Sequence, residues 1–450
     1  MLAVRCAQKQ AQNMTLRIRR LRNETSQTSR IWHLRQVQNV MEQWVRRNPL
    51  TLPATLLGLQ LAITVGFKLY KIKTGGAQDE QIVPSPSKTL LPKLSPEETA
   101  SCPYPPDAYP GTRDVESPYG SLRVYEWGPE NGRKVLLVHG ISNPCIALGA
   151  VAHGLADKGC RVMMFDLPGR GYSDTPVPTP HSNRLYTTTI LLALTSSPLS
   201  WTGNGETFSL IGYSLGGGIV VNFTSYFPFL VSSLVLLAPA GLVRQSRITL
   251  MNKILYNTGL INETTLEKIV IGRMRREELP ARPTKLKKKP SIGTAIGEEM
   301  PKEREEDIPT PPSLSHTRPN ITISGIIPWQ LDNHPGYIKS FMSSIRYGPI
   351  TGQHADWQRI AKRLAAQNAS MEERTQKEGL QNGKVLVIAG HKDAIIVEDE
   401  LVADATEILG ENSVRFEFVD AGHDLPVSKS KEILGFISAF WEESSSTPRS

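Results

Sequence analysis

The chain has 450 residues, of which 39% are apolar and 21% charged, a globular composition that excludes disorder throughout. Its four cysteines are sparse and have no CxxC spacing, which excludes a disulfide framework and indicates free thiols. The net charge is +8, but the first 73 residues alone carry thirteen Lys and Arg against two Glu, and subtracting their +11 leaves −3 for the rest.

The basic N-terminal arm, residues 1–49, precedes a predicted membrane-spanning helix at residues 50–70. No nucleic-acid-binding motif lies beside the arm, so its charge predicts targeting or membrane contact and no nucleic-acid partner. From Leu50 to Phe67 there are eighteen residues without a charge, flanked on both sides by Arg or Lys. A cleaved mitochondrial presequence or a packed helix has a similar composition, and both alternatives stay open. We expect a single-pass membrane protein of the mitochondrion or the endoplasmic reticulum.

Residues 71–118 are rich in Pro, Ser and Gly and show no helical or strand period, which predicts a linker. From Tyr119 onward, short apolar runs alternate with helical stretches. This alternation predicts an α/β protein with a doubly wound, mostly parallel sheet. The predicted strands are 121–127, 134–140, 160–166, 206–212, 231–238, 384–390 and 414–420, and the predicted helices between and after them are 145–158, 183–195, 215–226, 395–409 and 428–441.

The sequence GYSLGG, residues 212–217, follows a predicted strand and precedes a predicted helix. GxSxG patterns arise by chance, but this context is that of a nucleophile elbow, where glycines relieve the crowding of a tight turn. Ser214 is therefore the predicted nucleophile, projecting at the carboxyl edge of the sheet. The alternative is a Gly-rich turn with a helix-capping serine.

A serine nucleophile needs a base, and the base needs an orienting acid. Asp393 lies just past the strand 384–390, and His423 lies just past the strand 414–420. The preceding strand, 231–238, is followed by Pro239 and offers no carboxylate. Asp393 is therefore the predicted acid and His423 the predicted base, although either side chain alone is also compatible with a capping or surface role.

Acyl transfer passes through a tetrahedral intermediate whose oxyanion needs two backbone N–H donors. Their positions in the sequence identify them. The amide of Leu215 follows the nucleophile at the start of a helix, and the amide of Ile141 follows the strand that ends at His139 and Gly140. Ile141 and Leu215 are the predicted oxyanion donors. His139 is expected to brace this loop.

These features resemble the α/β-hydrolase superfamily across residues 119–240 and 384–441. The segment FDLPGRGYSD, residues 165–174, looks like the family's DxPGxGxSD loop. The resemblance implies a Ser-His-Asp hydrolase with Ser214, His423 and Asp393 in those roles. Relatives that open epoxides or remove halide carry Asp at the elbow, where this chain has Ser214, so those two activities are disfavoured for it. Carbon–carbon bond hydrolases and haloperoxidase-like members keep the serine, so both stay open as alternatives.

Residues 241–383 exceed a normal connection and are predicted to be a lid or cap. Residues 245–278 and 320–366 show apolar helical spacing, whereas 281–319 are charged and Pro-rich and are predicted to be disordered. The core resumes at 384–441, and 442–450 form a tail. An apolar lid favours a small-molecule ester or lipid with an apolar acyl group, and no cofactor or metal is expected. A binding or scaffold protein that kept the fold remains the alternative from another class.

Overall fold

The computed structural model describes residues 81–203, 205–247, 261–277, 313–369 and 379–443, with the isolated positions 60, 62, 63, 66 and 256. The predictions for the basic arm at 1–49, most of the membrane helix at 50–70, and 281–312 lie outside these residues. Among the helices that the structure does describe, none has the length and apolar character that crossing a bilayer requires.

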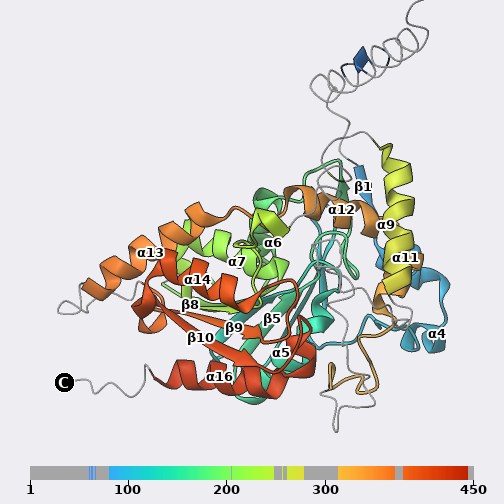
Figure 1. The fold of residues 1–450 in the computed structure, drawn as a ribbon. Coiled ribbons are helices and arrows are strands. Elements are labelled where there is room, and N and C mark those ends of the chain that lie inside the picture. The colour runs from blue at the N-terminus through green and yellow to red at the C-terminus, as the bar shows by residue number, and fades with distance from the viewer. Residues whose placement is uncertain are drawn as a thin grey trace, which may run out of the picture. The chain divides into compact units, whose positions relative to one another are not determined.

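An eight-stranded sheet lies at the centre of the unit that begins at Gln78 (Figure 1). Its order is β10-β9-β8-β7-β4-β5-β3-β2; the strands from β10 to β5 are parallel, and β3 is antiparallel to both of its neighbours. The bounds are β2 Arg113–Val115, β3 Leu122–Trp127, β4 Lys134–Val138, β5 Arg161–Phe165, β7 Phe208–Tyr213, β8 Val231–Leu237, β9 Val385–Gly390 and β10 Val414–Val419. The central strands are apolar along their whole length because helices cover both faces of the sheet. The predicted mostly parallel α/β sheet is confirmed.

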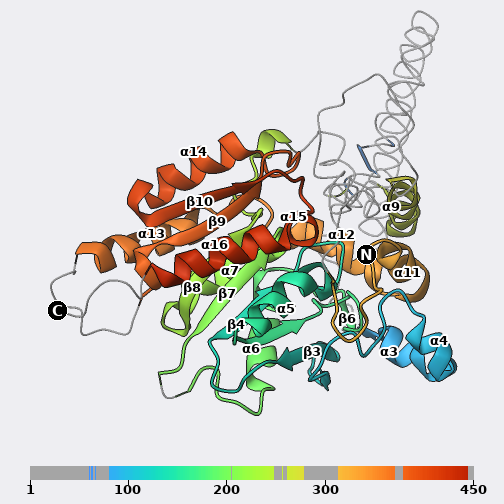
Figure 2. The same cartoon turned by 90° about the horizontal axis from the view of Figure 1, so that it is seen from below.

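Helices pack on both faces of this sheet (Figures 1 and 2). One face carries α5 (Gly149–Asp157) and α16 (Ser430–Glu442), with the short α15 (Leu425–Ser428) beside them. The other carries α6 (Asn183–Thr195), α7 (Leu215–Tyr226), α13 (His354–Ala369) and α14 (Glu398–Leu409). These helices pack on the sheet because each has an apolar face. In α16, Ile433, Ile437 and Phe440 recur at helical spacing, and all three are fully buried against the core.

The prediction of a linker at 71–118 is wrong for its described part. The strand β1 (Gln81–Val83) pairs antiparallel with β6 (Thr175–Val177), and the short helices α3 (Pro86–Thr89) and α4 (Pro96–Ala100) follow it. Tyr104 and Tyr109 are buried in the hydrophobic core. These aromatic side chains stabilise the segment by their burial. The sequence prediction overlooked them because Pro and Ser dominate the composition around them.

Asp174 connects this segment to the core. Its buried carboxylate accepts hydrogen bonds from the backbone N–H of Ser85 at 2.8 Å and of Ser121 at 2.9 Å. It also forms an ion pair with Lys88 at 2.7 Å. Because a buried carboxylate is costly without such partners, residues 85–88 belong to the folded domain.

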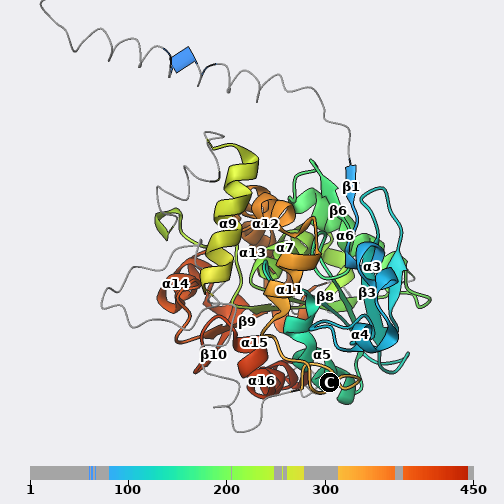
Figure 3. The same ribbon diagram turned by 90° about the vertical axis from the view of Figure 1, so that its right-hand side faces the viewer.

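The insertion after β8 contains α9 (Glu263–Glu277), α11 (Ile326–Asn333) and α12 (Tyr337–Tyr347), which lie together (Figure 3). The predicted lid boundary at 383 is wrong, because α13 packs on α7 as a core helix. The side chain of Gln353 donates to the carbonyl of Gly218 at 2.9 Å, and Asn222 donates to Asp356 at 2.8 Å. Helical spacing predicts α13 but does not say which surface it covers.

Part of the segment 281–319, predicted to be disordered, is ordered. Leu314 and Ser315 are buried, and the carbonyl of Leu314 accepts a hydrogen bond from the hydroxyl of Tyr109 at 2.8 Å. The prediction is therefore wrong for 313–319. Apart from Arg318 and Pro319, the charged residues and prolines that suggested disorder lie before residue 313.

Candidate active site

Ser214 lies between the end of β7 and the start of α7, with φ 53° and ψ −119°. A residue with a side chain rarely adopts a positive φ, so surrounding contacts must hold it. Its N–H donates to the carbonyl of Leu237 at 3.0 Å, and its carbonyl accepts from Gly217 and Ala240, both at 2.9 Å. These three bonds fix the turn and aim the side chain of Ser214 away from the sheet.

The two glycines nearest this turn are required by space. A Cβ on Gly212 would lie 2.5 Å from the carbonyl oxygen of Gly216, and a Cβ on Gly216 would lie 2.1 Å from the carbonyl oxygen of Val138. Both distances are too short for any side chain. The strand, the turn and the helix can therefore approach one another only with glycine at both positions.

The structure brings together the three residues predicted to act as nucleophile, base and acid. The Oγ of Ser214 lies 2.8 Å from Nε2 of His423, and Nδ1 of His423 lies 2.7 Å from Oδ2 of Asp393. The other carboxylate oxygen, Oδ1, accepts the backbone N–H groups of Ile395 at 2.8 Å and Ile396 at 2.9 Å. His423 is fully buried, and the Asp393 carboxylate lies beneath it out of water. Such an arrangement can move a proton from the serine hydroxyl to the imidazole.

A small apolar cavity adjoins Ser214. Both predicted oxyanion donors, Ile141 and Leu215, line it. The remaining lining residues are Ala240, Val243, Phe341, Ile345, Ile350, Ile395 and Ile396. Its volume is about 30 Å³, which is the space of one water molecule. Because Phe341 and Ile345 belong to α12, the insertion forms part of the wall of this cavity.

The loop that carries Ile141 is braced by His139, as expected. Its Nε2 accepts the backbone N–H of Leu167 at 2.8 Å, so its Nδ1 carries the proton and donates to the carbonyl of Gly140 at 2.8 Å. Burial, and after it the nearby positive charge of Arg170, lower the pKa of His139 to about 3. The imidazole is therefore neutral, and this tautomer is maintained across the physiological range.

A lowered pKa is shared by two further histidines, His181 and His334, and with His139 we call them the buried histidines. His153 is also buried, and burial and the neighbouring His316 lower its pKa to about 4. Burial lowers the pKa of His181 to about 3 and the pKa of His334 to about 4. In both cases the apolar surroundings disfavour the charged imidazolium. His423 is thus one of several histidines that are buried, and its contact with a serine and a carboxylate distinguishes it from these four.

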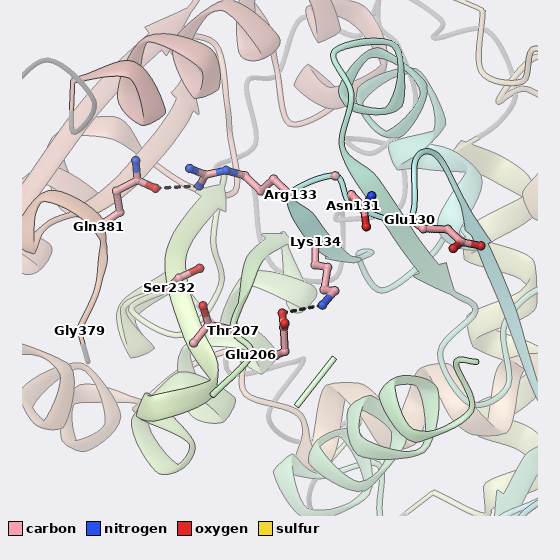
Figure 4. A pocket seen from close by; sticks show the side chains of 10 residues that line it. Glu130, Asn131, Arg133, Lys134, Glu206, Thr207, Ser232, Gly379 and Gln381 are labelled. Atoms are coloured by element: carbon pink, nitrogen blue, oxygen red, sulfur yellow. Dashed lines mark hydrogen bonds and ion pairs between the residues drawn. The ribbon is translucent and has the colours of Figure 1, made fainter. Parts of the chain in front are cut away.

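A larger cavity of about 610 Å³ lies at the opposite edge of the sheet, near the amino ends of β4, β7 and β8 (Figure 4). Of its charged side chains, Lys134 pairs with Glu206 at 2.6 Å, and Arg133 donates to the neutral amide of Gln381 at 2.8 Å. Its lining includes the hydroxyls of Thr207 and Ser232 but no histidine that could serve as their base. Volume alone therefore does not identify the reactive site.

Sequence reasoning missed four residues around the predicted oxyanion loop: Arg170, Gln330, Tyr337 and Ser340. Arg170 lies inside the DxPGxGxSD-like segment, which was the available signal. The other three come from the insertion, where nothing in the sequence indicates proximity to residue 141. Within the described residues, no cluster of His, Cys, Asp or Glu could hold a metal ion.

Comparison with known proteins gives a family and partial relatives. A family model described as the alpha/beta hydrolase fold matches residues 134–429. A serine hydrolase-like protein of Danio rerio is 31% identical over 125 residues, covering 28% of this chain and 36% of that protein. One of Dictyostelium discoideum is 32% identical over 123 residues, covering 27% and 33%. The matched region spans about a third of the length of these relatives. A solved putative lipase of Acinetobacter baumannii is 15% identical, with 76% and 94% coverage and a TM-score of 0.48.

Proposed function

Because residues 134–429 match its family model, the chain belongs to the α/β-hydrolase fold family, and from that membership we propose that it is a serine hydrolase cleaving esters of apolar acyl groups. The observation that carries the proposal is the pair of contacts at His423, 2.8 Å to Ser214 and 2.7 Å to Asp393. A hydroxyl with a base, and a base with an orienting carboxylate, are the parts that acyl transfer needs.

In the proposed mechanism, His423 removes the hydroxyl proton through Nε2 while Ser214 attacks the ester carbonyl carbon. Asp393 holds Nδ1–H and stabilises the imidazolium that forms. The amides of Ile141 and Leu215 receive the oxyanion. His423 then gives its proton to the leaving alcohol, and a water activated by the same base hydrolyses the acyl-enzyme on Ser214.

The lining of the cavity beside Ser214 is evidence for a substrate with an apolar acyl group. Ser214 is the only polar side chain among the ten residues that line it, so nothing there would pair with a charged or hydroxylated acyl chain. Its volume of about 30 Å³ is too small for an acyl chain, so binding requires the side chains of Phe341 and Ile345 to move. Once the acyl group is bound, these side chains also exclude water during the reaction.

The test combines a fluorophosphonate probe with p-nitrophenyl esters of increasing acyl length. Wild-type protein should be labelled and should hydrolyse the esters, and Ser214→Ala should do neither. The matched control is Ser225→Ala, since Ser225 lies on the same helix, α7, and its hydroxyl bonds to Asn222 and Asp356. Labelling that persists in Ser214→Ala would refute the assignment. Faster turnover of a β-diketone than of every ester would replace ester hydrolysis by carbon–carbon bond hydrolysis.

We also propose that residues 50–70 anchor the protein in a membrane. The support is the uncharged run from Leu50 to Phe67, which as a helix measures about 27 Å at 1.5 Å per residue, against roughly 30 Å of hydrocarbon. Alkaline carbonate extraction of the full-length protein tests this. Retention in the membrane pellet is the expected result, and release into the supernatant would contradict the anchor.

A further inference from the structure

The loop of residues 139–143, which we call the oxyanion loop, is held largely by side chains outside the strand that precedes it. We propose that Arg170, Gln330 and Tyr337 are positioning residues that set the amide of Ile141, so that the oxyanion hole is complete only while α11 and α12 are seated on the core. This inference rests on the proposed function.

A single peptide plane carries the donor N–H of Ile141. The carbonyl of Gly140 and the N–H of Ile141 belong to one trans peptide and therefore point in opposite directions. His139 fixes the carbonyl end through its hydrogen bond of 2.8 Å. The remaining freedom of the N–H is rotation of this plane about its flanking bonds, which the following residues of the loop must restrain.

The next two carbonyls of the oxyanion loop accept hydrogen bonds from side chains outside the loop. The carbonyl of Ile141 accepts from Nε of Arg170 at 2.6 Å. The carbonyl of Ser142 accepts from Nε2 of Gln330 and from the hydroxyl of Tyr337, both at 3.0 Å. Gln330 lies in α11 and Tyr337 in α12, and neither side chain is exposed. Two of the three donors therefore come from the insertion.

Arg170 joins the oxyanion loop to α12. Beyond its bond to Ile141, its guanidinium donates to the hydroxyls of Ser340 and Ser344, which lie one turn apart on that helix. The same group lies 5.5 Å from the ring centre of Tyr337. A planar fork with several donors can make these contacts at once, which a lysine cannot.

These contacts couple substrate entry to the reactive geometry. The side chains that must move for an acyl group to enter, Phe341 and Ile345, lie on the same rigid helix as Tyr337 and Ser344. A displacement of α12 would therefore remove the restraint on the oxyanion loop. Because losing an oxyanion donor costs about 10²- to 10³-fold in kcat, losing one support of that donor should cost about tenfold.

The test compares two tyrosine variants that each lose one hydroxyl. Tyr337→Phe removes the bond to the Ser142 carbonyl, whereas Tyr109→Phe removes an equivalent bond to the Leu314 carbonyl, far along the chain from the oxyanion loop. For Tyr337→Phe we expect kcat to fall about tenfold with KM nearly unchanged. The affinity for a trifluoromethyl ketone, whose hemiketal oxyanion uses the same donors, should weaken in the same proportion. Tyr109→Phe should match the wild type in both.

A second variant covers the case in which Tyr337→Phe does not fold. Arg170→Lys keeps the charge but cannot bridge Ile141 and α12, and it should show the same parallel loss of kcat and ketone affinity, at about tenfold or more. Equal kcat in Tyr337→Phe and Tyr109→Phe would overturn the proposal, as would a fall in kcat with unchanged ketone affinity. In either case the wild type still hydrolyses esters. Absence of wild-type turnover would instead refute the proposed function, and this inference with it.

Discussion

Replacing Asp393 by Asn changes one atom and tests the role of the acid. The oxygen Oδ1 of Asp393 already accepts two backbone N–H groups, from Ile395 and Ile396. In the Asp393→Asn variant the amide carbonyl must take this position, because the NH₂ group would face two donors there. The NH₂ group then faces Nδ1 of His423 and forces the imidazole proton onto Nε2. That nitrogen points at Ser214 and can no longer accept a proton from it.

The expected loss is about 10⁴-fold in kcat, which corresponds to about 5 kcal/mol of transition-state stabilisation. The assay is turnover of a short p-nitrophenyl ester together with thermal unfolding, which should be nearly unchanged because each hydrogen bond keeps a partner. The control is Asp420→Asn, an exposed carboxylate paired with Lys392 at 2.8 Å near the same loops, and its kcat should equal that of the wild type. If Asp393→Asn kept more than a tenth of the wild-type kcat, His423 would be oriented by another group and the reasoning would be wrong.

Three further predictions concern stability. A chain that begins at Gln78 should keep its fold, whereas one that begins at Ser101 loses two donors to the buried Asp174 and should be less stable by roughly 2 kcal/mol in urea unfolding; equal midpoints would contradict this. Gly216→Ala should abolish probe labelling because its Cβ meets a backbone oxygen, while Gly435→Ala, which has open space in α16, should raise the free energy of unfolding by about 0.5–1 kcal/mol. Burial lowers the folded pKa of the buried histidines below the 6.5 of the unfolded chain, so the unfolded state binds more protons below pH 6.5. Stability is therefore full above pH 6.5 and falls with acid, by roughly 2 kcal/mol per buried histidine at pH 5, and urea unfolding at pH 7 and pH 5 measures the difference.

The elements that the sequence predicted well are those whose signal is local. All seven predicted strands are present. Five of them, β4, β5, β7, β8 and β9, are mainly apolar runs that lie in the middle of the covered sheet. Because the carboxyl ends of parallel strands share one edge, their order also predicted that Ser214, Asp393 and His423 would meet. The catalytic roles of these residues and of Ile141 and Leu215 remain predictions.

The features that the sequence did not predict depend on contacts between distant segments. Residues 81–118 resemble a linker in composition, yet Tyr104 and Tyr109 are buried in a core built from later strands. Helical spacing indicated α12 and α13 equally well, but one walls the cavity and the other covers the sheet. Gln330 and Tyr337 reach the oxyanion loop across nearly two hundred residues, a separation at which no local pattern carries information.

The narrow cavity beside Ser214 has a consequence for kinetics. If its wall must move before an acyl donor larger than about 30 Å³ can enter, the rate of that opening belongs to the protein and is independent of the donor. At high concentration, reagents of very different intrinsic reactivity would then approach one common limiting rate. If the proposed ester hydrolysis holds, an enzyme gated in this way would select among substrates at entry, by the size and apolarity of the acyl group, before the leaving group has any influence on the outcome.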